Sequence, residues 1–586
     1  MVYTQSVHYI RKAQLMSHEL LSSITGPRVP LTITSCVLIL GLIACDDEGN
    51  PNEPVGGSLV AGLAPTAAVM AGARSGAEAG LFGGEPLGGG EPGGAEEAAG
   101  AVAGASGEEA GGGVMGGADS PELDVEPPPE PYPAPAYAVY IEPTEQRDGD
   151  PALGYDHFIN SPFVGCGFPT SIFDQIDVER FFPLVGLPSE SAYLEGRTGA
   201  NAELPYFLTH NVTDSGVEVA GLNCMNCHAS ALNGSLVVGL GNTTLKTVND
   251  PGVFARSMVS LYQDPAEREA ASYWAERMSA VGEAVVLDTR GVVAADNMAV
   301  VLFGRRDPQT MEWREDYQVE LPEGGLDPVP LAVPPLWRMG KKNAMFYSAS
   351  FRGDHTRFMF SASSLCVSGL DELLEIDSYF HHVRAWITEL EPPRWPGELD
   401  EARVQRGEER FMELCSRCHG SYEKTRTRRD LDRYPNLIIP IDEVNTDPML
   451  LAFESSFVEV FSDWVAASPL GQSNWLEDSP GYVAPPLDGI WSTAPYLHND
   501  SVPTLWDLLK SQDRPAYWRR LSARSDDLDE QRVGWAYTVE DQGRAEGAPP
   551  EIYDATRLGY LNTGHSYGDA LNDEERLDLI EYLKTL

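Results

Sequence analysis

Two copies of the motif Cys-x-x-Cys-His are the residues whose types and spacing most clearly predict chemistry in this chain. They are Cys224-Met225-Asn226-Cys227-His228 and Cys415-Ser416-Arg417-Cys418-His419. In each motif two thiols can bond to the vinyl groups of a haem, and the next imidazole can bind its iron. The motifs therefore predict two covalently attached c-type haems. The thioether bonds would involve Cys224, Cys227, Cys415 and Cys418, and His228 and His419 would bind the iron ions.

The same spacing has a second interpretation, in which each Cys pair is a redox pair or half of a zinc site. A zinc site requires a second Cys pair or a trailing His pair near the first. Neither motif has such a pair nearby. The residue pattern therefore favours haem attachment.

The beginning of the chain has the pattern of an export signal. Arg11, Lys12 and Arg28 precede an apolar run at 31–44, which is short for a transmembrane helix but has the length of a signal-peptide core. The run ends in Leu42-Ile43-Ala44-Cys45, which resembles a bacterial lipobox. We expect residues 1–45 to be a lipoprotein signal and Cys45 to carry the lipid. An ordinary secretory signal is the alternative. Lipidation would place the protein on the periplasmic side of a bacterial membrane or at the cell surface.

Residues 46–137 are rich in Gly, Ala, Pro and Glu and contain hardly any aromatic side chains. Such a segment cannot bury enough apolar surface to offset the entropy lost on ordering, so we expect a disordered tether. It carries about a third of the chain's net charge of -47. The acidic balance argues against nucleic acid as a partner, and a basic redox protein would be attracted to such a surface.

The remaining residues are numerous enough for two or three domains. We expect an N-terminal haem region at 138–397 and a C-terminal cytochrome c domain with a long insertion at 398–586. Helical patterns span Glu401–Leu414 and Asn572–Leu586. The fold predicted is mainly α with extensive loops, two cytochrome c-like haem domains and few short strands. In cytochrome c folds the first and last helices cross near a glycine, and Gly407, beside Phe411 and Tyr582, could supply that contact.

Two cysteines remain once the motifs, Cys45 and the signal are set aside, namely Cys166 and Cys366. In an oxidising compartment such a pair can form a disulfide, which would link the two ends of the first haem region. Sequence alone leaves open whether the two thiols meet.

The sixth ligand of each iron decides between electron carriage and catalysis, because an iron with a free face can bind oxygen or peroxide. Downstream of His419 the possible ligands are Met449, His498 and His565. For the first haem, His355, His381 and His382 remain possible, and a ligand there would exclude a catalytic role.

Three segments resemble a known family. The segment Ala484-Pro485-Pro486-Leu487 through Tyr496-Leu497-His498-Asn499 is similar to one shared by dihaem cytochrome c peroxidases and the dihaem rubber oxygenases, the RoxA-like proteins. Two further segments favour the latter, Lys341–Tyr347 with Arg352–His355, and Asn562–Gly568. The likeness runs from about residue 150 to the C-terminus.

The resemblance implies that the C-terminal haem is bis-histidine, with His419 proximal and His565 distal. It implies that His228 is the proximal ligand of the N-terminal haem, whose other face is open or holds oxygen. The expected function is then an oxidoreductase that activates dioxygen to cleave an apolar substrate. The alternatives are a peroxidase that reduces hydrogen peroxide with electrons from a small redox protein, and a non-catalytic electron-transfer lipoprotein.

The haem propionates would need cationic partners if buried. Several basic residues gather in one stretch and could contact propionates, or else form an exposed patch: Arg338, Lys341, Lys342, Arg352 and Arg357. Trp337 could relay electrons between haems, although a tryptophan of the core is the commoner role.

Overall fold

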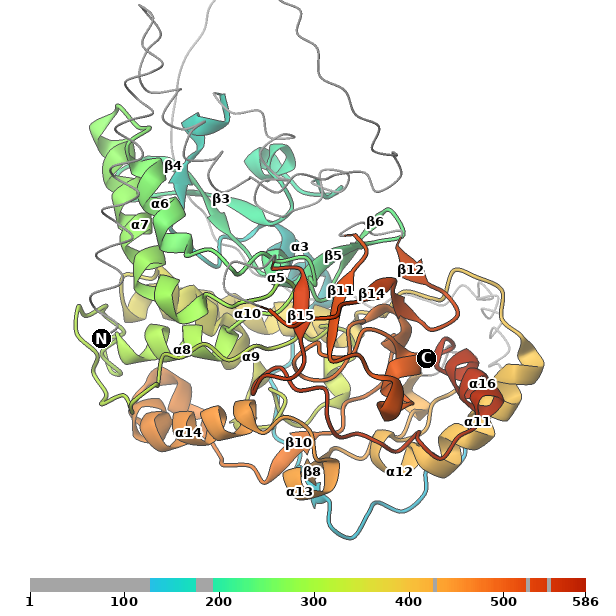
Figure 1. The fold of residues 1–586 in the computed structure, drawn as a ribbon. Coiled ribbons are helices and arrows are strands. Elements are labelled where there is room, and N and C mark those ends of the chain that lie inside the picture. Colours follow the sequence, from blue (N-terminus) through green and yellow to red (C-terminus); the bar gives the residue numbers. More distant parts are fainter. Residues whose placement is uncertain (1–126, 175–192, 425–428, 523–526, 545–549) are drawn as a thin grey trace, which may run out of the picture. The chain divides into compact units, whose positions relative to one another are not determined.

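The computed structural model describes residues 127–174, 193–424, 429–522, 527–544 and 550–586 (Figure 1). The predicted signal, the lipidated Cys45 and residues 46–126 of the predicted tether lie outside these ranges. The described residues belong to one compact unit. No helix among them combines the length and the apolar character needed to cross a bilayer.

The helices are joined by long irregular segments. Before residue 398 they are α3 (Pro151–Asn160), α5 (Met225–His228), α6 (Pro251–Val259), α7 (Pro265–Val285), α8 (Ala295–Gly304), α9 (His355–Met359) and α10 (Leu370–Glu389). After it they are α11 (Glu401–Leu414), α12 (Ser416–His419), α13 (Ile441–Val444), α14 (Met449–Ala467), α15 (Leu505–Leu508) and α16 (Asp573–Leu583).

The strands are short and pair in small antiparallel sheets. Three-stranded sheets have the orders β1-β8-β10, β2-β4-β3 and β14-β11-β15, and two-stranded ones are β5-β6, β7-β9 and β12-β13. The strands before residue 398 are β1 (Val139–Tyr140), β2 (Phe168–Pro169), β3 (Leu208–Val212), β4 (Glu218–Leu222), β5 (Ala229–Leu232), β6 (Ser235–Val238) and β7 (Phe351–Gly353). The later strands are β8 (Leu437–Pro440), β9 (Asn474–Leu476), β10 (Gly481–Val483), β11 (Tyr517–Arg520), β12 (Leu528–Asp529), β13 (Gly534–Trp535), β14 (Tyr537–Val539) and β15 (Ile552–Asp554).

Helices α11 and α16 lie against each other at the C-terminal end of the body (Figure 1). Gly407 permits this approach, because a Cβ at that position would lie 2.0 Å from the Asp578 carbonyl oxygen. One turn later, Phe411 packs against Tyr582 with ring centroids 5.0 Å apart. This contact between the predicted glycine and aromatic residues fixes the helix that leads directly into the second Cys-x-x-Cys-His motif.

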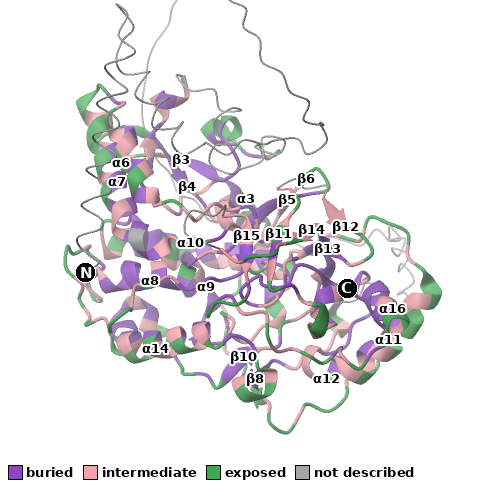
Figure 2. Ribbon diagram, viewed as in Figure 1, coloured by how far each residue is buried: buried purple, intermediate pink, exposed green. Residues whose placement is uncertain are grey.

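The two predicted haem regions share a core rather than separating near residue 398. Helix α14 belongs to the predicted C-terminal insertion, yet its Phe461 and Trp464 pack in one buried cluster with Phe303 of α8. Both helices have buried stretches along their ribbons (Figure 2). Strand β7 pairs with β9, and β1 pairs with β8. The N-terminal region is therefore completed by segments that come after the second motif.

The last residues of the predicted tether contact the body. The Tyr132 amide donates to Ser416 Oγ at 3.1 Å, and Glu130 forms an ion pair with Arg433. Tyr137 interacts with Tyr567, two residues beyond His565. Residues 127–137 thus run alongside the second motif.

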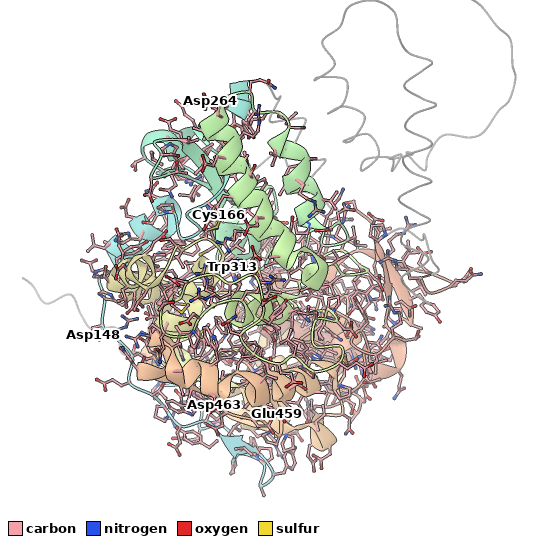
Figure 3. The ribbon with its side chains drawn as sticks, turned by 90° about the vertical axis from the view of Figure 1, so that its left-hand side faces the viewer. Asp148, Cys166, Asp264, Trp313, Glu459 and Asp463 are labelled. Carbon is pink, nitrogen blue, oxygen red and sulfur yellow. A yellow bond between two sulfur atoms is a disulfide. The ribbon has the colours of Figure 1, made fainter. Side chains whose placement is uncertain are left out.

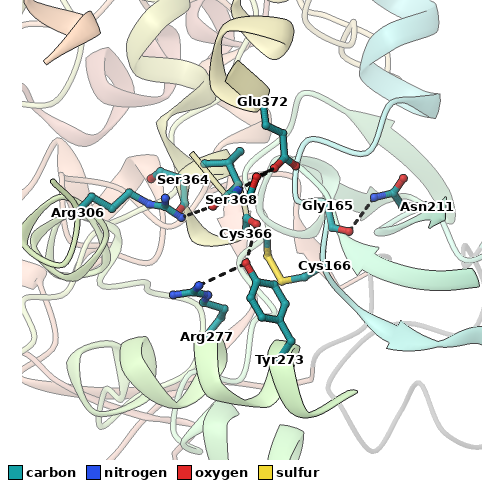
Figure 4. The surroundings of a disulfide bond; sticks show 11 residues. Gly165, Cys166, Asn211, Tyr273, Arg277, Arg306, Ser364, Cys366, Ser368 and Glu372 are labelled. Carbon is teal, nitrogen blue, oxygen red and sulfur yellow. Dashed lines mark hydrogen bonds between the residues drawn. A yellow bond between two sulfur atoms is a disulfide. The ribbon is translucent and has the colours of Figure 1, made fainter. Parts of the chain in front are cut away.

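Cys166 and Cys366 are joined in a disulfide, with Cα atoms 5.4 Å apart (Figure 4). The Tyr273 hydroxyl donates to the Cys366 carbonyl at 3.0 Å, and Asn211 Nδ2 donates to the Gly165 carbonyl at 2.7 Å. Backbone on both sides of the bond is therefore anchored. The bond ties the start of the N-terminal region to the segment that precedes α10.

Removal of this disulfide is expected to lower the stability strongly. The bonded residues are 200 positions apart. In the chain-entropy description a loop of that size restricts the unfolded chain by about 5 kcal/mol at 25 °C. The C166S/C366S double variant should therefore unfold at a markedly lower denaturant concentration. Under strong reduction the two proteins should converge, and equal stability under oxidising conditions would contradict this role.

A second internal feature is a pair of buried carboxyl groups without a cation. Asp296 of α8 and Glu454 of α14 are 7% and 4% exposed and lie close enough to share a proton. Ser348 Oγ donates to Glu454 Oε2. Burial raises the pKa of Asp296 to about 6, and burial together with Asp296 raises the pKa of Glu454 well above its ordinary value. The acidic Glu459 and Asp463 of the same helix are exposed instead (Figure 3).

This pair predicts a loss of stability at rising pH. A carboxyl group whose pKa is raised on folding binds its proton more tightly in the folded state, so it stabilises the fold at low pH only. That contribution should disappear from about pH 4 through pH 6 and beyond, by on the order of 2 kcal/mol. Thermal unfolding of D296N/E454Q should depend less on pH over this window. The exposed-face control E459Q/D463N should keep the full dependence, and the same slope in both variants would contradict the assignment.

Candidate functional site

Each Cys-x-x-Cys-His motif forms one short helical turn that ends in its histidine. The first is α5, followed at once by β5, and the second is α12, which continues from α11. The amides of His228 and His419 donate to the carbonyls of Cys224 and Cys415 at 2.9 and 3.0 Å. This turn brings both cysteines and the histidine of each motif together.

The two histidines are oriented in the same way by a proline carbonyl. His228 Nδ1 lies 3.1 Å from the Pro334 oxygen, and His419 Nδ1 lies 2.8 Å from the Pro485 oxygen. Because a carbonyl can only accept, each Nδ1 carries the proton and each Nε2 is left as the metal-binding nitrogen. Such a bond to the outer nitrogen is the usual support of a metal-binding histidine.

The carbonyl groups of Pro334 and Pro485 were not predicted as hydrogen-bond acceptors, although the sequence contains a pattern that marks them. Val333-Pro334-Pro335-Leu336 and Ala484-Pro485-Pro486-Leu487 are two copies of one short pattern, one after each motif. The first proline supplies the carbonyl in both copies. A search for internal repeats would have paired each motif with its own support.

His565 lies opposite His419. The two ring centroids are 6.2 Å apart. Two imidazoles that bind one metal ion from opposite sides, at metal–nitrogen distances of about 2 Å, have centroids roughly 6 Å apart. The predicted pair is therefore placed with room for one iron between its rings.

The turn that presents His565 is held by backbone contacts. His565 has a φ of 46° and follows Gly564 at 75°, where a Cβ would lie 2.3 Å from the Val444 oxygen. The His565 amide donates to that same oxygen at 2.9 Å. Arg514 donates to the carbonyls of Asn562 and Gly564 at 2.6 and 2.7 Å. These backbone contacts position the His565 ring, because its Nδ1 makes no hydrogen bond with a described residue.

All three histidines are suited to bind a metal in their neutral form. Burial lowers the pKa of His228 to about 4 and that of His565 to about 3, where His419 and Arg514 add to the effect. Burial also lowers the pKa of His419. Each side chain nevertheless keeps intermediate exposure. The rings are therefore surrounded by protein yet accessible on one side, as ligands of a bound group must be.

The four motif cysteines are free thiols. Burial raises the pKa of Cys224 and of Cys415 to about 12. It raises the pKa of Cys227 and of Cys418 to about 11. Redox-active Cys pairs depend on lowered pKa values. The motifs therefore differ from such pairs and fit thioether attachment of a haem.

His228 has no counterpart to His565 among the residues that the structure describes. His355 is buried beside Lys342, which acts electrostatically on both histidines, but its ring makes no close contact with His228. His382 accepts a hydrogen bond from the Asp150 amide at 2.8 Å, and His381 packs against His382. The three alternative ligands are thus not brought opposite His228.

The remaining candidates lie in the packing between the two motifs. His498 is buried and stacks on Tyr482 with centroids 4.4 Å apart, and its carbonyl accepts from the Ala332 amide at 2.7 Å. Met449 begins α14 and packs against a hydrophobic cluster. Trp337 is 2% exposed and donates through Nε1 to the Asp488 carbonyl at 2.7 Å, so it connects the segments after the two proline pairs.

Comparison with known proteins identifies part of this region. Residues 481–519 match the family model described as RoxA-like, cytochrome c-like. This segment contains Pro485, which supports His419, and Arg514, which holds the His565 turn. A cytochrome c-like domain binds haem, so the chain is at this level a haem-binding cytochrome with a RoxA-like segment.

Two relatives are proteins of Sinorhizobium fredii whose names describe them as uncharacterized. The protein y4iM is 30% identical over 231 residues, which are 33% of this chain and 51% of the relative. The protein y4iJ is 29% identical over 260 residues, which are 34% of this chain and 42% of the relative. The matches thus span about half the length of these relatives or less.

Proposed function

We propose that the protein is a dihaem c-type cytochrome and an oxidoreductase whose two haem sites differ. One observation carries the proposal. The ring centroids of His565 and His419 are 6.2 Å apart, whereas no described imidazole lies opposite His228 in this way. A haem held by two imidazoles transfers electrons at its edge, while one with an open face supplies the capacity to bind and reduce dioxygen or peroxide.

The residues around the first motif would bind and shield the N-terminal haem. Cys224 and Cys227 would hold it, and His228 would bind its iron through Nε2, oriented by the Pro334 carbonyl. The cysteines and histidine of the second motif, with His565, would hold the C-terminal haem. The residues fit both groups because the thiols are free and the three histidines are only partly buried by protein.

The segment that follows Lys342 is rich in aromatic side chains. Phe351 packs against Phe346, Phe358 and Phe457 at centroid distances of 4.4, 3.9 and 5.6 Å. These residues follow Lys342, which lies near enough to His228 to influence its pKa. Such a wall excludes water and suits an apolar, olefinic substrate. We therefore favour dioxygen-dependent oxidative cleavage of such a substrate.

Glu454 favours a second candidate, the reduction of hydrogen peroxide with electrons from a small redox protein. That reaction requires a group that moves protons near the open face. Glu454 lies one turn before Phe457, which contacts Phe351, and burial with Asp296 raises its pKa so that it holds a proton. Electron transfer without catalysis is the third candidate and requires a sixth protein ligand at both irons. In each case we infer lipid anchoring through Cys45 on the periplasmic side of a membrane or at the cell surface.

Two incubations of the purified dihaem protein distinguish the reactions. In the first, polyisoprene or a carotenoid is supplied with dioxygen, and carbonyl products are measured by mass spectrometry. In the second, hydrogen peroxide is supplied with a reduced small cytochrome, and its oxidation is followed. We expect cleavage in the first, and its loss in the C224S/C227S variant. Turnover only in the second would establish the peroxidase, and turnover in neither would overturn the proposed catalytic function.

A further inference from the structure

The basic residues after Trp337 are not equivalent in the structure. Lys341 Nζ pairs with Asp488 at 2.7 Å and with Asp432 at 2.8 Å. Arg338 pairs with Glu391 at 2.6 Å, Arg357 with Asp377 at 3.4 Å and Arg352 with Glu477 at 3.7 Å. Four of the five cations expected to contact propionates thus have carboxylate partners within the protein. Lys342 is the exception.

Lys342 and one cation from α10, Arg384, make no ion pair and no side-chain hydrogen bond with any residue that the structure describes. Burial lowers the pKa of Lys342 to about 8 and is the largest cause lowering that of Arg384. Both keep intermediate exposure. They are therefore enclosed by protein but accessible on one side.

His355 is a third polar group affected by both cations. It is 1% exposed, and neither of its ring nitrogens makes a hydrogen bond of normal geometry with a described residue, only a looser contact with the Asn343 backbone. Arg384 and Lys342 both act on it electrostatically. An imidazole buried to this extent normally has a partner, because an unpaired polar group costs free energy. Arg384 Nε is likewise buried without a hydrogen-bond partner, so Arg384 and His355 both have polar nitrogens that a ligand could satisfy.

The nearby acidic residues do not neutralise these two cations, because they are bound to other groups or lie too far away for an ion pair. Asp354 accepts from Arg147 Nε at 2.7 Å and from the Thr356 amide at 2.9 Å. Asp488 acts on Lys342 electrostatically but forms its ion pair with Lys341. Asp148 acts on Arg384 only at a distance that gives no ion pair. Two enclosed cations without anions are unfavourable unless a ligand supplies the negative charge.

We propose that Lys342, Arg384 and His355 form a carboxylate-binding site on the side of the N-terminal haem, and that its occupants are the propionates of that haem. The inference rests on the proposed function, since it requires a haem at the first motif. Lys342 connects the cluster to that motif because it also acts on His228. A carboxylate of a free ligand would satisfy the same chemistry, and the experiment separates the two sources.

The test is the reduction potential of each haem in the full-length dihaem protein, followed by spectroelectrochemistry. Removal of cations beside the propionates stabilises the oxidised haem. In K342M/R384M we therefore expect the potential of the N-terminal haem to shift to lower values, with that of the C-terminal haem unchanged. The R357M variant removes a cation that already has a carboxylate partner and should shift neither. If the double variant binds less haem, the charge-conserving K342R/R384K should restore both haem content and potential.

A titration with oleate tests whether a free carboxylate ligand, rather than the haem propionates, occupies the site. A free carboxylate would be the occupant if two results were found together. Oleate should cause saturable spectral changes in the native protein that are lost in K342M/R384M, and without oleate the haem potentials of the variant should equal those of the native protein. Two attached haems with unshifted potentials and no oleate effect would overturn the site. A native protein with a single attached haem would overturn the proposed function instead, so the two failures are distinguishable.

Discussion

Replacement of His565 by alanine is expected to convert the C-terminal haem from low spin to high spin. His565 and His419 lie on opposite sides of a space that fits one iron, with ring centroids 6.2 Å apart. Removal of one strong ligand leaves the iron five-coordinate or bound to water. The low-spin EPR signal should therefore disappear and a high-spin signal replace it, while both haems stay attached through their cysteines.

His210 provides the control for this variant. It lies on β3 with a partly buried side chain, and its ring is paired with Glu218 at 3.9 Å, away from the second motif in the sequence. H210A should leave the spectrum unchanged. A low-spin C-terminal haem that persists in H565A would remove His565 from the ligand set.

Replacement of the cysteines of one motif should remove one haem and leave the other. The C415S/C418S variant is expected to lose the low-spin haem, and C224S/C227S the haem with the open face. Each loss should be complete, because a serine hydroxyl forms no thioether bond. Haem staining of denatured protein and intact mass would measure the number attached.

The disulfide variant C166S/C366S serves as the control, since it removes two sulfur atoms outside the motifs. It should keep both haems. If either motif variant retains two haems, or if the native protein carries one, the assignment of the motifs is wrong.

The final helix was predictable in some detail because its signals are local. Asn572 caps α16 and forms a capping box with Glu575. Gly407, Phe411 and Tyr582 meet where α11 crosses α16. The helical pattern alone did not show how far α16 is buried. Leu579 is fully buried and Arg576 is 1% exposed, because the helix is covered on more than one side.

Contacts between distant segments were not predictable in this way. Residues 127–137 have the composition of a tether, yet Glu130 and Tyr132 contact the second haem region through an ion pair and a backbone hydrogen bond. Helix α14 reads as an insertion but fills the core around Phe303. Its apolar face shows that it is buried, and only the tertiary structure shows against what.

The candidate site shows the same difference between local sequence patterns and contacts of distant segments. The motifs and His565 could be found because residue type and spacing define them. The partners of the basic stretch could not, because Asp432, Asp488 and Glu391 come from separate parts of the chain. Of the five basic residues, the structure leaves Lys342 without a carboxylate partner among the described residues. Our proposal joins it to Arg384, which the sequence did not indicate, and to His355, which the sequence had offered only as a possible iron ligand.

The most direct test of the central claim is an EPR spectrum of the purified, oxidised native protein, recorded with its absorption spectrum and haem content. We predict two haems per chain that differ in axial ligands and spin state. One should be low spin with two imidazole ligands, and the other should be high spin or respond to a small ligand such as cyanide, and after reduction its absorption spectrum should respond to dioxygen. Two low-spin haems that ignore added ligands would contradict it.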